Sequence, residues 1–431
     1  MKESAMKQEN TPYDQLSTQC LKVKDSTGFL RLLSSKQKNL GLKEIAKQLL
    51  VCQDEILQAN KIDLEQAHSK QLTESQLARL RLDQDRLRSM AHDVSTLADL
   101  PDPIGETIEE KILSNGLNVR RVRVPLGVVG VIYESRPNVT VDIASLCLKS
   151  SNGVLMRGGS EALNSNRALV RIIHKAVESC GITKQFLQFI DSTERNIIKE
   201  IINMDSYLDL IIPRGGSDLI QFVKEHSSIP AITGGIGVCH TYIDKDADLD
   251  KAVAIAHNAK ISNPSVCNAL DTLLIHTDVS DVILPKIAQS LVEAGVELRC
   301  DPKSLAILCS QNLLCKPAQD SDWGNEFLSL IASIRVVDSL EEALWHISHY
   351  GSGHSEAIVT ENQNSKQQFL NEVDAAAVFA NTSTRFTDGS ALGLGSEVAI
   401  STSKLHARGP MGMRELTSYK WIIQGDGQIR T

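Results

Sequence analysis

The fold is decided by the stretch VLMRGGSEALNSNRALVRIIHKAVESCG, residues 154–181. Its short apolar beginning predicts a strand over 154–159, because a parallel strand that is covered on both faces is apolar throughout. An amphipathic helix is expected over 166–180, and Gly181 is a typical residue at which such a helix stops. Its apolar stripe is formed by Leu169, Ile172, Ile173 and Ala176. This order of strand, turn and helix is typical of an α/β unit.

Similar apolar runs occur on both sides of this unit. Together with 154–159, they predict strands at 128–133, 186–190 and 208–213. A second alternation after Pro230 predicts strands at 239–244, 272–276, 305–309, 333–338 and 356–360. Ser339 and Glu342 have the spacing of a capping box for a helix that follows. The expected fold class is therefore α/β, with two doubly wound α/β domains.

Two segments predict strands that leave these domains. LSNGLNVRRVRVPLG, residues 113–127, combines an Asn-Gly pair with alternating apolar residues, which is typical of a hairpin. The closing segment 416–430 has apolar residues around Trp421 to Ile423. Exposed strand edges are natural contacts between subunits, so we expect a small β oligomerisation arm and a homodimer or homotetramer.

The composition excludes several classes of protein. The 431 residues carry Lys+Arg 45 and Asp+Glu 53, a net charge of -8, with no block of basic residues, which argues against nucleic acid as a partner. No signal peptide and no apolar run near the roughly 18 residues of a spanning helix are found, so no membrane role is expected. Nine cysteines without a paired framework indicate reduced thiols and a cytoplasmic protein. No metal is expected, because His346 and His349 lack partners at metal spacing.

Cys267 is the candidate nucleophile. It lies in SNPSVCNAL, residues 262–270, with a proline three residues before it and an asparagine directly after it. These neighbours favour a thiol on a turn between helices. The alternative is a core cysteine, because free cysteine is among the most buried residue types.

Two glycine-rich turns follow predicted strands of the first sheet. They are Arg157-Gly158-Gly159-Ser160 and Pro213-Arg214-Gly215-Gly216-Ser217. Glycines let the backbone approach an anion, the arginines add charge, and Ser160 and Ser217 stand where an N-cap is expected. Neither turn is a Gly-x-Gly-x-x-Gly fingerprint or a P-loop, and each alone could be a plain loop. Two such turns in one sheet predict a phosphate site.

Eight motifs, in one order along the chain, resemble the gamma-glutamyl phosphate reductases, a branch of the aldehyde dehydrogenase superfamily. The resemblance runs from about residue 10 to the C-terminus. The motifs are VPLGVVGVIYESRPNVTVDIASLCLKS (124–150), LMRGG (155–159), IIPRGG (211–216), ITGGIGVCH (232–240), SNPSVCNA (262–269), GSGHSEAIVT (351–360), STRFTDG (383–389) and STSKLHARGPMG (401–412).

The resemblance implies an aldehyde dehydrogenase-like fold and NADPH-dependent reduction of L-glutamate 5-phosphate to L-glutamate 5-semialdehyde plus phosphate, the second step of proline biosynthesis. Cys267 would carry the glutamyl group as a thioester that is then reduced. The oxyanion hole would be built by Asn138 or Arg136 with the backbone amide of Cys267. Register with the superfamily favours Arg136, whereas side-chain type favours Asn138.

A missing base favours the reductive direction. Oxidative members use a glutamate to activate the water that hydrolyses the thioester, and the corresponding position, two residues before Gly234-Gly235, is Ile232. An apolar side chain cannot act as a base. The alternatives are an oxidative NAD(P)-dependent semialdehyde dehydrogenase and a non-catalytic protein of the same fold.

The resemblance also suggests binding residues. Arg157 would meet the 2′-phosphate of the adenosine ribose, which favours NADPH; the alternative is an arginine that reaches solvent from a strand end. The superfamily's Glu-x-Phe-Gly segment reads Ser390-Ala391-Leu392-Gly393, so Glu397 is a candidate replacement for the ribose carboxylate. Substrate candidates are Arg385, Arg408 and Asn268, with Lys404 and His406 beside them and Asp388 or Glu134 for the ammonium. Surface salt bridges would explain these charges equally well.

The expected domains follow from these motifs. Residues 1–112 and 126–236 would bind the cofactor, with a return of the chain near 384–400. Residues 237–383 would form the catalytic domain that carries Cys267, and 113–125 and 405–431 would be oligomerisation strands. A functional association with glutamate 5-kinase is also expected.

Overall fold

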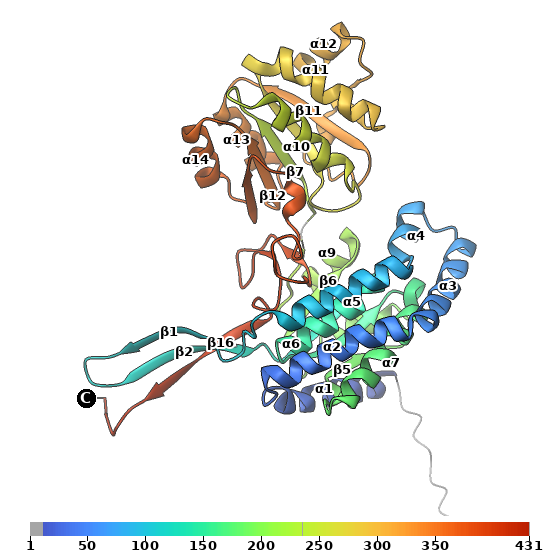
Figure 1. The fold of residues 1–431 in the computed structure, drawn as a ribbon, viewed down its shortest axis with the longest axis vertical. Helices are drawn as coiled ribbons and strands as arrows, with labels where there is room; N and C mark the ends of the chain where they lie inside the picture. The colour runs from blue at the N-terminus through green and yellow to red at the C-terminus, as the bar shows by residue number, and fades with distance from the viewer. Residues whose placement is uncertain (1–11, 235, 431) are drawn as a thin grey trace, which may run out of the picture. The chain divides into compact units, whose positions relative to one another are not determined.

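The computed structural model describes residues 12–234 and 236–430, which form two compact units (Figure 1). The first unit runs through residue 233 and also contains 393–399 and the chain from 411 onward. The second unit comprises 234–392 and 400–410. The roles expected for the domains remain predictions.

The first unit contains a parallel sheet in the order β5-β4-β3-β6. Its strands are β3 (Val128–Tyr133), β4 (Gly153–Gly158), β5 (Leu187–Phe189) and β6 (Leu210–Arg214). The connecting helices are α6 (Asn138–Lys149), α7 (Leu163–Ser179), α8 (Asn196–Ile201) and α9 (Ser217–His226). These positions confirm the four strands expected from apolar runs. β3 and β4 are buried along their whole length.

Helices from the N-terminal part of the chain belong to the same unit. They are α1 (Pro12–Leu30), α2 (Ser35–Val51), α3 (Gln53–Ser69), α4 (Glu74–Leu80) and α5 (Gln84–Asp99). A buried charge cluster ties them to α6: the Lys38 ammonium pairs with Asp102 at 2.5 Å and donates to the Lys149 carbonyl at 3.0 Å. Lys149 in turn donates to the carbonyl of Ala98 at 2.8 Å. The end of α6 is therefore fixed by α2 and α5.

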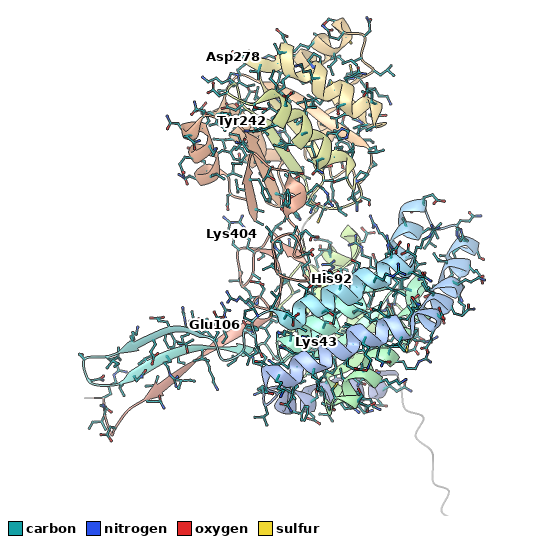
Figure 2. All side chains as sticks on the ribbon, in the orientation of Figure 1. Lys43, His92, Glu106, Tyr242, Asp278 and Lys404 are labelled. Carbon is teal, nitrogen blue, oxygen red and sulfur yellow. The ribbon has the colours of Figure 1, made fainter. Side chains whose placement is uncertain are left out.

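The second unit contains a seven-stranded sheet in the order β10-β9-β11-β8-β7-β12-β13, in which all neighbours are parallel. Its strands are β7 (Cys239–Ile243), β8 (Leu270–His276), β9 (Glu297–Cys300), β10 (Lys316–Pro317), β11 (Ile331–Val337), β12 (Ser355–Val359) and β13 (Ala377–Ala380). Its helices are α10 (Leu249–Ile261), α11 (Thr277–Glu293), α12 (Pro302–Ser310), α13 (Leu340–Tyr350) and α14 (Gln363–Glu372). Tyr242 lies fully buried in this sheet (Figure 2).

The strand expected at 305–309 is wrong, because these residues lie within α12. Asp301 caps this helix by accepting from the Ser304 amide, and Pro302 occupies the first turn, where its missing N–H costs nothing. A five-residue apolar run alone does not distinguish a strand from a helix. The cap at Ser339 is confirmed, because its side chain accepts from the Glu342 amide at the start of α13. The other half of the expected capping box is wrong, because the Glu342 carboxylate accepts from the Asp338 amide instead of the Ser339 amide.

The expected ribbon is present as a three-stranded antiparallel sheet (Figure 1). The expected bounds of its hairpin, 113–127, are wrong, because the first strand lies before residue 113. Its strands are β1 (Thr107–Ile112), β2 (Asn118–Pro125) and β16 (Thr417–Gln424). The Asn-Gly turn lies between β1 and β2, with Gly116 at a φ of +84°. Glu106 (Figure 2) pairs with Arg123 at 3.0 Å and with Arg414 at 3.1 Å, so it joins β2 to the segment before β16.

The remaining elements are short. They are η1 (Ser160–Ala162), η2 (Lys184–Phe186), η3 (Asp320–Asp322), η4 (Thr384–Phe386), β14 (Ile400–Ser401) and β15 (Gly409–Pro410). Within the described ranges, no helix has the length and apolar character that crossing a membrane requires.

The charge cluster at the end of α6 predicts a pH dependence of stability. Burial lowers the pKa of Lys149 to about 8, below its usual 10.5. Between these values the unfolded chain binds a proton that the folded chain does not, so the free energy of unfolding should fall as pH decreases from 10.5 to 8. Urea unfolding at both ends of this window should show a smaller change in Lys149→Met. The exposed Lys61→Met is the control; an unchanged slope in Lys149→Met would contradict the assignment.

Candidate active site

The loop that carries Cys267 is closed by a buried ion pair. It connects α10 to β8, so the expected turn between two helices is wrong. Cys267 on this loop is partly exposed and is not part of the core. Lys260, in the last turn of α10, donates to the Leu270 carbonyl at 2.7 Å and pairs with Asp271 of β8 at 3.6 Å. Burial raises the pKa of Asp271 to about 6 and lowers that of Lys260. The contacts of Lys260 with Leu270 and Asp271 therefore hold the two ends of the loop together.

The segment before β7 contacts the Cys267 backbone directly. A Cβ at Gly237 would lie 1.8 Å from the Cys267 carbonyl oxygen, so only glycine allows this approach. The Cys239 thiol donates to the same oxygen at 3.2 Å. Burial raises the pKa of Cys239 well above its usual value, which keeps the thiol protonated and able to donate. The Cys267 backbone is thereby fixed from one side.

A chain of buried side chains continues from Cys239. Its sulfur lies 3.9 Å from His354 Nδ1, and that nitrogen is 2.8 Å from the Ser355 hydroxyl. Ser355 contacts the Thr387 hydroxyl at 2.7 Å. Burial lowers the pKa of His354 to about 4, so its imidazole is neutral at physiological pH. This network joins β7 and β12 to the segment that follows η4.

Asn268 and Arg385 form the other side of the loop. The Asn268 amide donates to the Thr387 carbonyl at 2.9 Å, and its carbonyl oxygen accepts from the Arg385 guanidinium. Arg385 also donates to Ser262 at 3.0 Å and interacts electrostatically with Cys267. Asn268 is only 4% exposed, so its side chain contacts Arg385 and Thr387 and is nearly inaccessible to solvent. The structure thus places a half-buried cation within electrostatic range of the thiol.

Arg408 lies in a charge cluster of its own. Its guanidinium pairs with Asp374 at 2.8 Å, and Lys404 pairs with the same carboxylate. The two cations lower the pKa of Asp374. A salt bridge therefore accounts for the charges of Arg408 and Lys404, as the alternative interpretation of the sequence has it.

In the first unit, Arg157 lies at the end of β4 and is 6% exposed. Its Nε has no hydrogen-bond partner among the described residues, and burial lowers the pKa of the guanidinium. The neighbouring Glu161, which sequence reasoning missed, accepts from the Ser135 hydroxyl at 2.8 Å. An orphaned, buried guanidinium N–H fits an anionic group of a nucleotide.

The second glycine turn is also occupied by a carboxylate. The Gly216 amide donates to Glu134 at 2.9 Å. The N-cap positions expected at Ser160 and Ser217 are wrong by one residue, because Gly159 caps η1 and Gly216 caps α9, neither through a side chain. The Ser217 side chain lies outside the described part of the structure.

The glycines of the first turn are needed for packing. A Cβ at Gly158 would lie 2.2 Å from the Asn166 side chain, and one at Gly159 would lie 2.1 Å from Glu161. At the second turn, a Cβ at Gly215 would lie 2.5 Å from Glu134. At both turns the missing Cβ therefore leaves room for a carboxylate beside the backbone.

The two oxyanion candidates lie in one turn after β3. Asn138 is the first residue of α6, and its amide donates to Asp142 at 3.0 Å; Arg136 lies two residues earlier and is half-buried. Burial raises the pKa of Asp142 to about 7. An Asn138 amide group has a second N–H, so its hydrogen bond to Asp142 leaves a donor available. Both alternatives stay open.

Ile232, at the position of the missing base, is 4% exposed, and its amide donates to the Ile211 carbonyl at 2.9 Å. Its side chain therefore belongs to the core of the first unit. Ser390 and Leu392 are both exposed. The exposed Ser390-containing turn is held by Asp388, which accepts from the amides of Ser390 and Ala391.

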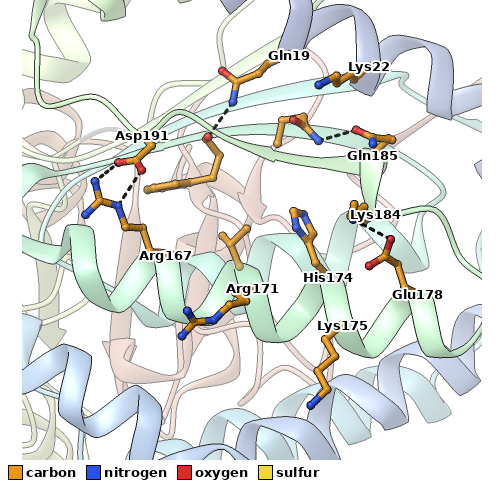
Figure 3. A pocket seen from close by; sticks show the side chains of 13 residues that line it. Gln19, Lys22, Arg167, Arg171, His174, Lys175, Glu178, Lys184, Gln185 and Asp191 are labelled. Atoms are coloured by element: carbon orange, nitrogen blue, oxygen red, sulfur yellow. Dashed lines mark hydrogen bonds and ion pairs between the residues drawn. The ribbon is translucent and has the colours of Figure 1, made fainter. Parts of the chain in front are cut away.

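A cavity of about 730 Å³ lies in the first unit between α1, α7 and β5 (Figure 3). No sequence-predicted site residue lines it. Gln19 donates to the Phe189 carbonyl at 3.1 Å (Figure 3). His174 contacts the Leu187 carbonyl at 2.9 Å, so two of its lining residues cover the edge of β5. In residues 12–234 and 236–430, no group of three or more His, Cys, Asp or Glu residues is arranged to hold a metal ion.

Comparison with known proteins agrees with this arrangement. Residues 37–304 match the model of the aldehyde dehydrogenase family. A gamma-glutamyl phosphate reductase of Dehalococcoides mccartyi (strain CBDB1) is 54% identical over 403 residues, which are 93% of this chain and 95% of the relative. The chain belongs to the aldehyde dehydrogenase family, among the gamma-glutamyl phosphate reductases.

Solved aldehyde dehydrogenase family members share the fold. The crystal structure of gamma-glutamyl phosphate reductase from Thermotoga maritima has a TM-score of 0.92 and 44% identity, and covers 97% of this chain and 100% of that one. An engineered glycolyl-CoA reductase with bound NADP⁺ has a TM-score of 0.70 at 13% identity, over 95% of this chain and 96% of that one, and so is similar in fold alone. Enzymes of the family use nicotinamide cofactors. The aldehyde dehydrogenase-like fold expected from the eight motifs is confirmed.

The close approach of Gly237 to Cys267 generates a prediction. Gly237→Ala should force the Cys267 backbone to move, and a displacement near 1 Å costs on the order of 10²-fold in rate. The measurements are turnover and the rate of Cys267 alkylation by iodoacetamide. The matched control is Gly28→Ala, since a Cβ at Gly28 meets nothing within 4 Å. Full activity in Gly237→Ala would refute the importance of this contact.

Proposed function

We propose that this protein reduces L-glutamate 5-phosphate to L-glutamate 5-semialdehyde with NADPH and releases phosphate, as the second step of proline biosynthesis. It is an oxidoreductase that acts on a small molecule. The observation that carries the proposal is 54% identity to a gamma-glutamyl phosphate reductase over 95% of its length. The anchored, partly exposed Cys267 supplies the chemistry that this reaction needs.

Cys267 acts as the nucleophile in this proposal. Its thiolate attacks the acyl carbon of the substrate, a C–S bond forms, and phosphate leaves. Arg385 is within electrostatic range of the sulfur, so it stabilises negative charge there and on the departing phosphate. The contacts of Gly237 and Cys239 hold the Cys267 backbone in one conformation, which positions its N–H as an oxyanion donor. Bound NADPH supplies the hydride that reduces the thioester to the aldehyde level.

The first unit supplies the groups proposed for the cofactor. Arg157 offers a charged N–H without a partner among the described residues, which suits a 2′-phosphate. Glu161, the nearest acidic neighbour in sequence, already accepts from the Ser135 hydroxyl, whereas the Arg157 N–H is left for the cofactor. This favours NADPH over NADH. The turns at Gly158-Gly159-Ser160 and Gly215-Gly216 would contact the rest of the nucleotide.

The absence of a base at Ile232 distinguishes the reductase from an oxidative dehydrogenase. A buried isoleucine cannot activate water, so the thioester persists until it is reduced. The second candidate function, oxidation of a semialdehyde to a free acid, requires that base. Ile232 therefore favours the phosphate-releasing reductase.

We also propose that the three-stranded ribbon serves oligomerisation. It exposes apolar side chains at Ile112, Tyr419, Trp421 and Ile423, which a partner subunit would cover. A homodimer or homotetramer in a cytoplasmic enzyme fits this surface. The association expected with glutamate 5-kinase stays a prediction.

The assay in the reverse direction tests the function. Glutamate 5-semialdehyde should reduce NADP⁺ only when phosphate is present, because phosphate must cleave the thioester. Cys267→Ala should lose at least 10³-fold in this rate, since the covalent route disappears. Cys180→Ala, another partly exposed cysteine, should retain activity and serves as the control.

Three outcomes would contradict the proposal. Turnover to free glutamate without phosphate would indicate the oxidative dehydrogenase. Full activity in Cys267→Ala would show that another group is the nucleophile. Absence of NADPH binding and of Cys267 alkylation would instead identify a non-catalytic protein of this fold.

The cofactor assignment gives a separate prediction. Arg157→Ala should raise the KM for NADPH by roughly 10- to 100-fold, as expected for loss of a charge-assisted hydrogen bond, and should leave the KM for NADH nearly unchanged. Arg167→Ala is the matched control, because Arg167 is exposed and pairs with Asp191 at 2.6 Å. An equal loss for both cofactors in Arg157→Ala would argue against contact with the 2′-phosphate.

A further inference from the structure

Three cysteines that the proposed reaction does not use gather at one edge of the second unit. Cys300 ends β9 and is buried, Cys309 is exposed near the end of α12, and Cys315 directly precedes β10 and is partly exposed. Exposed cysteine is unusual, because the residue is among the most buried types. The cluster therefore differs from the single core cysteines of the chain.

The backbone explains why these residues meet. The chain reverses after α12 through Asn312, whose φ is +57°, and the Leu313 amide donates to the Leu308 carbonyl at 3.1 Å. β10 then pairs with β9 so that Pro317 lies beside Cys300. Cys315, two residues earlier, points to the same face of the sheet as Cys300, because side chains alternate along a strand.

The sulfur atoms of the cluster interact with each other. Cys315 packs against the core cluster that contains Cys300, and its thiol interacts with those of Cys309 and Cys300. Burial raises the pKa of Cys300 to about 12. Cys300 is therefore a protonated core thiol, whereas Cys309 is open to reagents in solution. Cys315 lies between the two environments.

We propose that Cys309 and Cys315 form a reversible dithiol–disulfide site, which small hydroperoxides oxidise and small thiols reduce. The site is independent of the proposed reductase activity and of Cys267. Cys309 and Cys315 flank a short reversal at the surface, so a bond between them joins the end of α12 to the start of β10 without crossing the core. Cys300 is not the thiol that a hydroperoxide reaches, because it is 1% exposed.

The chemistry balances with a hydroperoxide as the oxidant. The Cys309 thiolate attacks a peroxide oxygen, an S–O bond forms, the O–O bond breaks, and the departing oxygen takes a proton as water or an alcohol. Cys315 then attacks the sulfur of the sulfenic acid, an S–S bond forms, and the oxygen leaves as water. Two exchange steps with a small thiol restore both cysteines and produce the disulfide of that thiol.

The test uses the wild-type protein, so it does not depend on a variant that folds. The protein is treated with hydrogen peroxide, its remaining thiols are alkylated with iodoacetamide, and tryptic peptides are analysed by mass spectrometry. Trypsin does not cut between Lys316 and Pro317, so both cysteines lie in the peptide 304–335, whereas Cys300 lies in the peptide 300–303. The expected product is peptide 304–335 lighter by two hydrogen atoms and without alkylation, and dithiothreitol should restore double alkylation.

Controls separate this site from general oxidation. Cys180 is partly exposed, so it should react with the oxidant without forming an internal link. In Cys315→Ser, Cys309 should end as a sulfenic or higher acid instead of a disulfide. The proposal is overturned if peptide 304–335 stays doubly alkylated when Cys180 has been oxidised, or if Cys315 is linked to the peptide of Cys300.

Discussion

The buried pair of Lys260 and Asp271 is the interaction on which the Cys267 loop depends. Two charges in an apolar interior are tolerated only when each neutralises the other, and loss of one partner leaves an uncompensated charge. The pair joins the end of α10 to the start of β8, with the carbonyl of Leu270 as a further acceptor. The ion pair thereby fixes the loop that carries the Cys267 thiol to the rigid sheet of the second unit.

Carboxylates at the two glycine turns point to how the first unit handles negative charge. Glu134 accepts from the Gly216 amide of the second turn, whereas Glu161, which follows the first turn, accepts from Ser135. A nucleotide phosphate placed at the second turn would therefore have to share the Gly216 amide with Glu134. Arg157 is the group that offsets this charge. Burial lowers the pKa of its guanidinium, and the carboxylates of Glu161 and Glu134 act in the opposite direction.

Local patterns in the sequence predicted the elements, whereas contacts between distant segments were not predictable. All-apolar runs identified β3 and β4 because both faces of these strands are covered. The run at 305–309 was predicted as a strand, but it lies in a helix whose N-terminus is capped by Asp301. Arg385 was identified by its charge. Its hydrogen bond to Asn268 depends on the position of η4 beside the Cys267 loop, which the sequence does not indicate. No spacing rule connects residues more than a hundred positions apart.

The same residue type has different chemistry at different positions, and burial decides which. Cys20 is fully buried, and its pKa is raised to about 12, so it is a small apolar side chain in effect. Cys239 is equally buried, but the carbonyl of Cys267 lies within reach, which turns a core thiol into a donor that fixes the loop. Cys267 itself is partly exposed and lies near Arg385. The reactivity of Cys267 therefore follows from its exposure to solvent and from the neighbouring Arg385. Its backbone is held in place by the buried thiol of Cys239.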